Sequence, residues 1–123
     1  MIWIDSSFAI EWLLGSERAS KVQLPKVELA ILEAQYAEIV VIFSKHITDL
    51  APTVAQLESL SLKHATKAEL VVAAREYLHV RAKKSKASLA DVILATVAKL
   101  RDDSVATFDK NFDLLGCHIV ADR

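Results

Sequence analysis

Short apolar runs alternate with longer segments of mixed polarity along the 123-residue chain. Apolar runs of this length, bounded by turn residues, are typical of strands buried on both faces, as in a parallel sheet. They predict strands at residues 2–5, 27–32, 104–109 and 117–120, with 60–65 as a weaker candidate. The segments between them start at capping or turn residues and predict helices over 6–14 (capped by Ser6 or Ser7), 17–22, 33–45, 52–60, from Thr66 or Glu69 to 81, and 89–100, with a helical turn ending at 115.

Strands that alternate with helices predict an α/β fold: a three-layer sandwich around a mainly parallel five-stranded sheet. No linker interrupts the chain, so we expect residues 1–123 to form a single domain. Hydrophobic residues make up 53% of the sequence, which excludes an intrinsically disordered protein.

Two of the predicted helices carry apolar faces, and the first of them bears on partners. In the first, Phe8 and Trp12 are one turn apart and would form an exposed aromatic patch, typical of a partner site, unless residues 17–22 fold over them. In the helix after Thr66, one stripe at helical spacing holds Leu70, Val71, Ala74, Tyr77, Leu78 and Arg81.

The length of the apolar runs, the cysteine count and the net charge say more about where the protein is located than about what it does. The apolar runs are too short to span a bilayer and no signal-peptide pattern opens the chain, so we expect a cytoplasmic protein without a membrane partner. A single cysteine excludes an intramolecular disulfide, which suits a reducing compartment. The net charge of −1 does not indicate a nucleic-acid partner, so evidence for one has to come from local chemistry.

Two aspartates, Asp5 and Asp109, each follow an apolar strand. Ligand sites in open α/β sheets lie beyond the carboxyl ends of the strands, so both carboxylates are expected to face one crevice. Carboxylates that close repel each other unless a cation lies between them. Each aspartate taken alone is explained equally well as a helix cap.

Three further residues join this hypothesis, each with an ordinary alternative. Glu38 has apolar neighbours on nearly every side of its helix, so it reaches a cleft, a cation or a buried salt-bridge partner. Asp91 has capping-box spacing from Ser88, but the first turn of that helix also faces the sheet end. Thr107 points the same way as Asp109 in a strand, where its hydroxyl orients a carboxylate or merely packs.

The types of residue present narrow the chemistry. Four acids without a histidine or cysteine ligand cluster suit a hard cation such as Mg²⁺ or Mn²⁺. With only two glycines, the chain has no phosphate-binding glycine loop, and it has no nucleophile-elbow motif. Carboxylate-bound Mg²⁺ without a nucleotide cradle indicates phosphodiester hydrolysis.

A basic segment precedes the helix that holds Asp91. A modest cationic patch beside an acidic crevice suits backbone-led binding of single-stranded RNA. The alternative is a solvated helix end, where the helix dipole favours cations. The residues that we assign to RNA binding are Arg75, Arg81, Lys83, Lys84 and Lys86.

Four segments together resemble one known family. Residues 4–7 (IDSS), 37–39 (AEI), 88–98 (SLADVILATVA) and 106–112 (ATFDKNF) resemble the motifs of PIN-domain ribonucleases, and most of all the VapC-type toxins of prokaryotic toxin–antitoxin operons. The resemblance covers nearly the whole chain, with the motifs in the family's order and spacing.

This resemblance implies a fold, a reaction and partners. It implies a parallel sheet in the order 3-2-1-4-5, Mg²⁺ or Mn²⁺ as cofactor, and endonucleolytic cleavage of RNA that leaves 5′-phosphate and 3′-hydroxyl ends. It also implies a homodimer and an antitoxin protein. Carried over by position, the catalytic and metal-binding acids are Asp5, Glu38, Asp91 and Asp109, and the supporting residues are Ser6, Thr107 and Asn111.

One departure from the family bears on the mechanism. Many members have a further aspartate where this chain has Asn111, which weakens a second metal site and favours one-metal chemistry.

Other functions remain open at this point. One is a PIN-type RNA-processing nuclease without an antitoxin. Another is a receiver-like signalling domain, which would need an adjacent acidic pair after the first strand, where this chain has Asp5-Ser6-Ser7. A third is a non-catalytic protein-binding scaffold, against which the four intact acids argue.

Overall fold

A computed structural model describes residues 1–46 and 48–120. In this part of the chain, five strands form one sheet in which every neighbouring pair is parallel. The strand order β3-β2-β1-β4-β5 confirms the predicted fold class and the order that the resemblance implies. The strands are β1 (Ile2–Ile4), β2 (Leu29–Leu32), β3 (Ser61–Lys63), β4 (Ser104–Ala106) and β5 (His118–Ile119).

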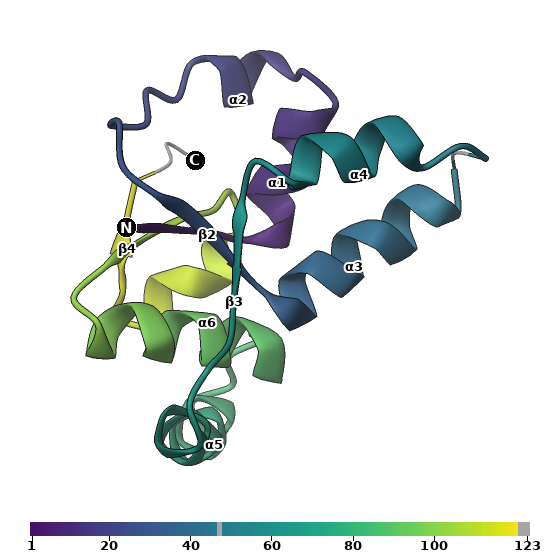
Figure 1. Ribbon diagram of the computed structural model, residues 1–123. Coiled ribbons are helices and arrows are strands. Elements are labelled where there is room, and N and C mark those ends of the chain that lie inside the picture. Colours follow the sequence, from purple (N-terminus) through teal and green to yellow (C-terminus); the bar gives the residue numbers. More distant parts are fainter. Residues whose placement is uncertain (47, 121–123) are drawn as a thin grey trace.

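Helices cover both faces of the sheet, as Figure 1 shows, with α5 and α6 on one side of it and α1 and α3 on the other. None of the described helices is long and apolar enough to cross a membrane. The helices are α1 (Ser6–Leu13), α2 (Glu17–Ser20), α3 (Glu33–Ser44), α4 (Ala51–Leu57), α5 (Lys67–Ala82), α6 (Leu89–Leu100) and the 3₁₀ helix η1 (Lys110–Leu114).

Strand β1 explains why the core has two halves. Its side chains alternate between the two faces of the sheet. Ile2 and Ile4 pack in the cluster beneath α1, α3 and α4, whereas Trp3 packs with α5 and α6. All three side chains are buried, as expected for the central strand of a sheet covered on both faces.

The register of the two middle strands positions the site. Ile4 of β1 lies beside Ala106 of β4, so the chain leaves the sheet at the same edge in both strands. Asp5 and Thr107 are therefore the first residues beyond two adjacent strand ends. The amide of Asp5 donates a hydrogen bond to the carbonyl of Ala106 (3.0 Å), which holds this arrangement.

Several element boundaries differ from the sequence prediction. The β4 strand ends at Ala106 rather than at Asp109, because the residues after Ala106 turn towards η1. Of the caps considered for α1, the N-cap is Asp5, as its alternative explanation predicted, and not Ser6 or Ser7; the Asp5 side chain accepts a hydrogen bond from the amide of Ser7. The weakly predicted third strand exists, but its central residue Leu62 is exposed, since β3 is an edge strand and lacks a continuous apolar run.

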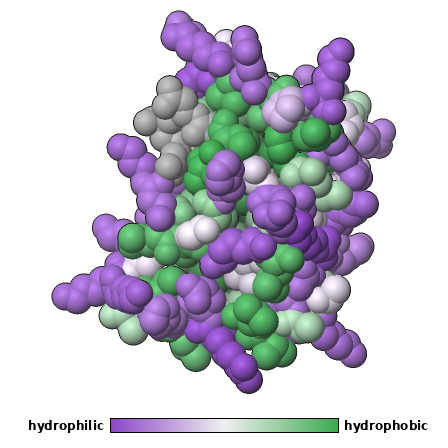
Figure 2. Space-filling view, turned by 90° about the vertical axis from the view of Figure 1, so that its left-hand side faces the viewer, coloured by the Kyte–Doolittle hydropathy of each residue, from purple (hydrophilic) through white to green (hydrophobic). Residues whose placement is uncertain are grey.

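Most of the apolar stripe predicted on α5 does not face the core, although Tyr77 packs against it. Leu70, Val71 and Leu78 are exposed, Leu78 by 71%, whereas Ala73 and Val80 are buried. The reason is that α5 packs on α6 rather than on the sheet, and small residues allow that close approach. In Figure 2, apolar surface accordingly appears in the lower half of the molecule, at the height of α5 and α6.

The aromatic patch predicted on α1 is reduced to one residue. Phe8 is buried, because its ring stacks on Phe108 (5.2 Å between centroids) and both α1 and α2 contribute to the same core cluster. Trp12 is 39% exposed and lines a groove of about 270 Å³ between α1, α2 and β2. The alternative, in which residues 17–22 fold over the rings, is correct for Phe8.

Candidate active site

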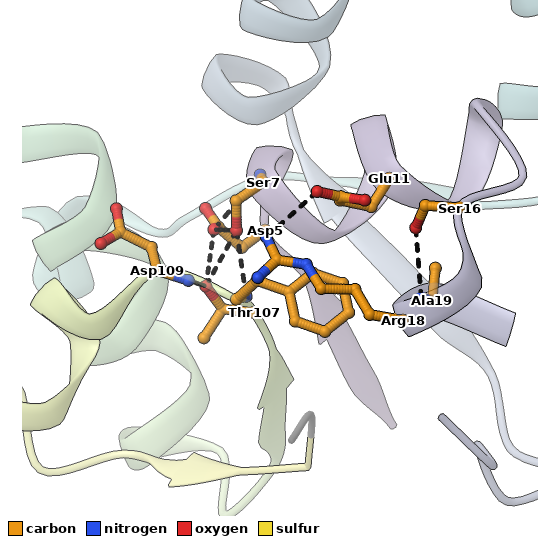
Figure 3. Close-up of polar contacts among 9 residues, drawn as sticks. Asp5, Ser7, Glu11, Ser16, Arg18, Ala19, Thr107 and Asp109 are labelled. Carbon is orange, nitrogen blue, oxygen red and sulfur yellow. Dashed lines mark hydrogen bonds and ion pairs between the residues drawn. The ribbon is translucent and has the colours of Figure 1, made fainter. Parts of the chain in front are cut away.

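The Asp5 carboxylate is fixed by hydroxyl groups from two elements (Figure 3). Its Oδ2 atom accepts hydrogen bonds from Ser7 Oγ (2.6 Å) and Thr107 Oγ1 (2.7 Å), and from the amide of Ser7 (3.3 Å). Asp5 is only 1% exposed. Within the described residues, its other oxygen, Oδ1, is buried without a hydrogen-bond partner.

Burial decides the protonation of Asp5. Loss of solvent raises the pKa of its carboxyl group to about 6, and the nearby charge of Asp91 adds to that rise. The hydrogen bonds from Ser7 and Thr107 act in the opposite direction but do not cancel it. The site therefore keeps a carboxylate in a place where its charge is costly, which is common at functional sites.

Thr107 and Ser7 also tie the loop after β4 to the start of α1. Thr107 Oγ1 accepts a hydrogen bond from the amide of Asp109 (3.0 Å), and Ser7 Oγ accepts one from the amide of Phe108 (3.1 Å). The Thr107 hydroxyl does contact a carboxylate, but that of Asp5 and not that of Asp109, beside which the sequence had placed it. The sequence indicated Ser7 only as a helix cap.

Asp91 and Asp109 both cap helices, as their alternative explanations predicted. Asp91 forms the capping box of α6 with Ser88, and Asp109 Oδ1 accepts a hydrogen bond from the amide of Asn111 (2.8 Å) at the start of η1. Burial raises the pKa of Asp91, and the charge of Asp109 adds to this rise. The cap positions thus also bring the two carboxylates close enough to interact.

Glu38 reaches the site through Ser6. Its Oε2 atom accepts a hydrogen bond from Ser6 Oγ (2.9 Å), and its side chain is half-buried. Among the described residues it forms no salt bridge, so the structure does not contain the buried ion pair that was the alternative.

Gln35 belongs to the site but was missed from the sequence. It is fully buried one turn before Glu38, and its Oε1 atom accepts a hydrogen bond from the amide of Ser6 (2.8 Å). Its Nε2 atom makes no hydrogen bond of ordinary geometry with the described residues, yet it is near enough to Asp91 to lower the pKa of that carboxyl group. The signal available in the sequence was the spacing: Gln35 lies three residues before Glu38, so both side chains are on the same face of α3.

Three of the four predicted acids interact through their charges, and the fourth, Glu38, contacts the residue next to Asp5. The charges of Asp5 and Asp91 interact, as do those of Asp91 and Asp109, and Glu38 is connected through Ser6. As placed, however, no three histidine, cysteine, aspartate or glutamate side chains in the described chain lie close enough to form a complete ligand set. The expectation of carboxylates that already share a cation is therefore not met.

The donor atoms nevertheless fit a hard cation. The oxygen Oδ1 of Asp5 is buried and unsatisfied, and an orphaned buried carboxylate oxygen is costly unless a positive charge reaches it. The charged group that acts on Asp5 is the carboxylate of Asp91, and carboxylates are the ligand type that Mg²⁺ and Mn²⁺ prefer.

The predicted RNA-binding cations lie on α5 and in its connection to α6. All five are exposed, and none forms an ion pair with a site carboxylate in the described part of the chain. Arg81 Nη1 donates a hydrogen bond to the carbonyl of Ser85 (3.3 Å), and Lys84 has a positive φ of 61°. The connection leads directly into the capping box that holds Asp91.

Solved structures share this architecture over nearly their whole length. The toxin VapC20 of Mycobacterium tuberculosis, described as cleaving the sarcin–ricin loop, has 19% identity and a TM-score of 0.76, with 99% of this chain and 100% of that chain covered. VapBC2 of Rickettsia felis, solved with a DNA fragment from its promoter, has 13% identity and a TM-score of 0.77, with 97% of each chain covered. FitAcB of Neisseria gonorrhoeae has 18% identity and a TM-score of 0.74, with 97% and 96% covered.

These identities are low, so the structural similarity shows a shared fold. No curated protein matches the sequence. The family model of the PIN domain, however, matches residues 2–116, which include all four acids and the whole sheet except its last strand. The chain therefore belongs to the PIN domain family.

Proposed function

We propose that this protein is a metal-dependent endoribonuclease that hydrolyses RNA phosphodiester bonds and acts as the toxin of a toxin–antitoxin pair. The observation that carries the proposal is the state of Asp5. One of its oxygens accepts hydrogen bonds from hydroxyl and amide donors, while the other is buried without a hydrogen-bond partner among the described residues, and the charge of Asp91 acts on the same carboxyl group. A carboxylate held in this way is prepared for a cation rather than for a structural role.

In this proposal Asp5, Asp91 and Asp109, with Glu38, would hold Mg²⁺ or Mn²⁺. Such an ion, when bound, supplies the positive charge that phosphodiester hydrolysis requires and makes water more acidic. Thr107 and Ser7 keep the Asp5 carboxylate in one orientation. Gln35 and Ser6 hold α3 against the start of α1, so that Glu38 stays at the site.

Metal removal tests the proposed reaction. Single-stranded RNA should be cut in the presence of Mg²⁺ or Mn²⁺ and should stay intact with excess chelator, with activity restored by adding the metal back. Analysis of the fragment ends should give 5′-phosphate and 3′-hydroxyl groups. Cleavage that continues in chelator would overturn the mechanism.

The basic segment between α5 and α6 is the second part of the proposal: its cations contact RNA phosphates. We expect the combined variant Lys83→Ala, Lys84→Asn and Lys86→Ala to bind RNA more weakly and with a smaller salt dependence. The log–log slope should fall by about 0.7 for each phosphate that the variant no longer neutralises. Asparagine is chosen at Lys84 because it tolerates the positive φ.

A triple variant of exposed lysines elsewhere is the matched control, since it changes the net charge equally: Lys26→Ala, Lys45→Ala and Lys67→Ala. The measurement is a binding titration over a range of salt concentrations. Equal slopes for the two triple variants would make the segment a solvated helix end.

We also propose a homodimer, an antitoxin partner and a cytoplasmic location, where RNA is available. Several solved structures with this fold are described as toxin–antitoxin complexes or as VapBC assemblies. The exposed Trp12, in its groove between α1 and α2, is the surface that we propose for a partner. Light scattering measures the dimer, and co-purification with the product of a neighbouring gene detects the antitoxin. A monomer that co-purifies with no such product would instead indicate an RNA-processing nuclease.

A further inference from the structure

Arg18 lies at the edge of the acidic site although it is far from the basic segment in the sequence. Its guanidinium carbon is 4.2 Å from the centre of the Phe108 ring. Phe108 is the residue between Thr107 and Asp109, and its amide is hydrogen-bonded to Ser7 Oγ. Figure 3 shows Arg18 extending from α2 towards Asp5 and Thr107. The guanidinium is therefore one aromatic ring away from the loop that carries the site.

The position of this guanidinium is fixed from a second side. Arg18 Nη2 pairs with Glu11 Oε1 on α1 (3.1 Å). A hydrogen bond from Ser16, followed by the influence of Arg18, lowers the pKa of Glu11, so Glu11 is ionised at neutral pH. The ring below and the carboxylate beside it restrict the rotation of Arg18, which reduces the entropy lost when a ligand binds.

Arg18 packs on the stacked rings of Phe8 and Phe108, and it is the exposed member of this group of three. Phe8 and Phe108 are both buried, so neither ring offers a surface to a ligand. The Arg18 side chain is 55% exposed, and its ion pair with Glu11 is made through Nη2. The remaining N–H donors of a planar guanidinium match two phosphate oxygens.

The negative charge of the site explains what the Arg18 guanidinium would do there. The charge of Asp91 interacts with those of Asp5 and Asp109, and carboxylates gathered in this way repel an approaching phosphodiester. A fixed cation at the rim offsets that repulsion at the point where RNA enters. Resting on the proposed function above, we propose that Arg18 binds an RNA phosphate next to the scissile bond and so positions the substrate at the acidic site.

The test compares Arg18→Ala and Arg18→Lys with Lys21→Ala in RNA cleavage and in salt-dependent RNA binding. Lys21 is a matched control because it follows Arg18 on the same helical turn, pairs with Glu17 and is 72% exposed. We expect Arg18→Ala to raise KM about tenfold, with a smaller change in kcat, and to reduce the salt slope by the equivalent of about one phosphate. Arg18→Lys should restore the slope but only part of the affinity, because lysine lacks the planar fork.

Three results would overturn the inference. The first is Arg18→Ala matching Lys21→Ala in KM and slope. The second is a loss of thermal stability in Arg18→Ala with unchanged KM, which would mean that Arg18 only stabilises the packing of α2 on Phe108. The third applies if Arg18→Ala does not fold. In that case an unchanged KM in Arg18→Lys would exclude a contact between the planar guanidinium and a phosphate. Failure of the proposed function is seen separately, as wild-type protein that does not cut RNA.

Discussion

Replacing Asp5 with asparagine is expected to reduce RNA cleavage by about a thousandfold or more, as loss of a central catalytic group commonly does. Asparagine keeps the size of the side chain and an oxygen that accepts hydrogen bonds from Ser7 and Thr107, so the geometry around it is retained. What it removes is the negative charge at the buried position that we assign to the cation. Initial rates of RNA cleavage at saturating Mg²⁺ measure the effect.

The same variant should make the metal-free protein more stable at neutral pH. The pKa of Asp5 is about 6 in the folded state against 3.8 as its ordinary value, so the folded state loses its proton at a higher pH than the unfolded chain. Below about pH 4 the group is mostly protonated in both states and has little effect. Between about pH 4 and about pH 6 the unfolded chain ionises while the folded protein keeps its proton, so the folded state loses stability. Above about pH 6 this loss is complete, at about 3 kcal/mol, and asparagine avoids it.

Thermal unfolding in chelator at pH 4 and pH 7.5 measures this difference. The control is Asp102→Asn, which makes the same chemical change at an exposed position whose positive φ suits asparagine. Asp5→Asn should raise Tm at pH 7.5 and not at pH 4, whereas the control should have little effect at either pH. Full activity, or a lower Tm at pH 7.5, would contradict the role given to Asp5.

The central strands and the acidic edge were predictable because their signals are local. Strands β1 and β4 are apolar runs followed by a polar residue, and a parallel sheet brings their carboxyl ends to one edge. The sequence could not decide whether Asp5, Asp91 and Asp109 are helix caps or site residues. In the structure all three cap a helix, and Asp91 interacts with both other acids. For Asp5 and Asp109 the reason is that each begins a helix shortly after a strand ends, whereas Asp91 lies in the first turn of α6, which follows α5.

What the sequence did not predict depends on tertiary contacts. The stripe on α5 has helical spacing, but periodicity shows which residues share a face and not which neighbour that face meets. Gln35 and Arg18 acquire their roles only because α3 and α2 pack against the start of α1 and against Phe108. Strand β3 has an exposed central residue, so it lacks the continuous apolar run by which buried strands are recognised.

Removing the charge of Glu69 is expected to destabilise the fold by about 2 kcal/mol at neutral pH, the range for hydrogen bonds to charged groups, with allowance for the partly exposed Arg101. Glu69 is 7% exposed, and its two oxygens accept hydrogen bonds from Arg101 Nε and Nη2, both at 2.8 Å. Arg101 Nη2 also donates to the carbonyl of His64 (3.0 Å), and Glu69 completes the capping box of α5 with Thr66. This one carboxylate therefore joins the start of α5 to the end of α6.

The pH dependence of this destabilisation follows from the pKa of Glu69, which the hydrogen bonds from Arg101 lower to about 2 from an ordinary 4.5. Because the unfolded chain binds the proton at higher pH than the folded protein, the stabilisation is complete above about pH 4.5 and disappears as the pH falls towards 2. Urea unfolding of Glu69→Gln should therefore show a lower midpoint than wild type at pH 7 and a smaller difference at pH 3. Glu76→Gln on the same helix is the control, since Glu76 forms no salt bridge with the described residues. If Glu69→Gln unfolds with the wild-type midpoint at pH 7, the ion pair contributes nothing net, and α5 is held to α6 by apolar packing alone.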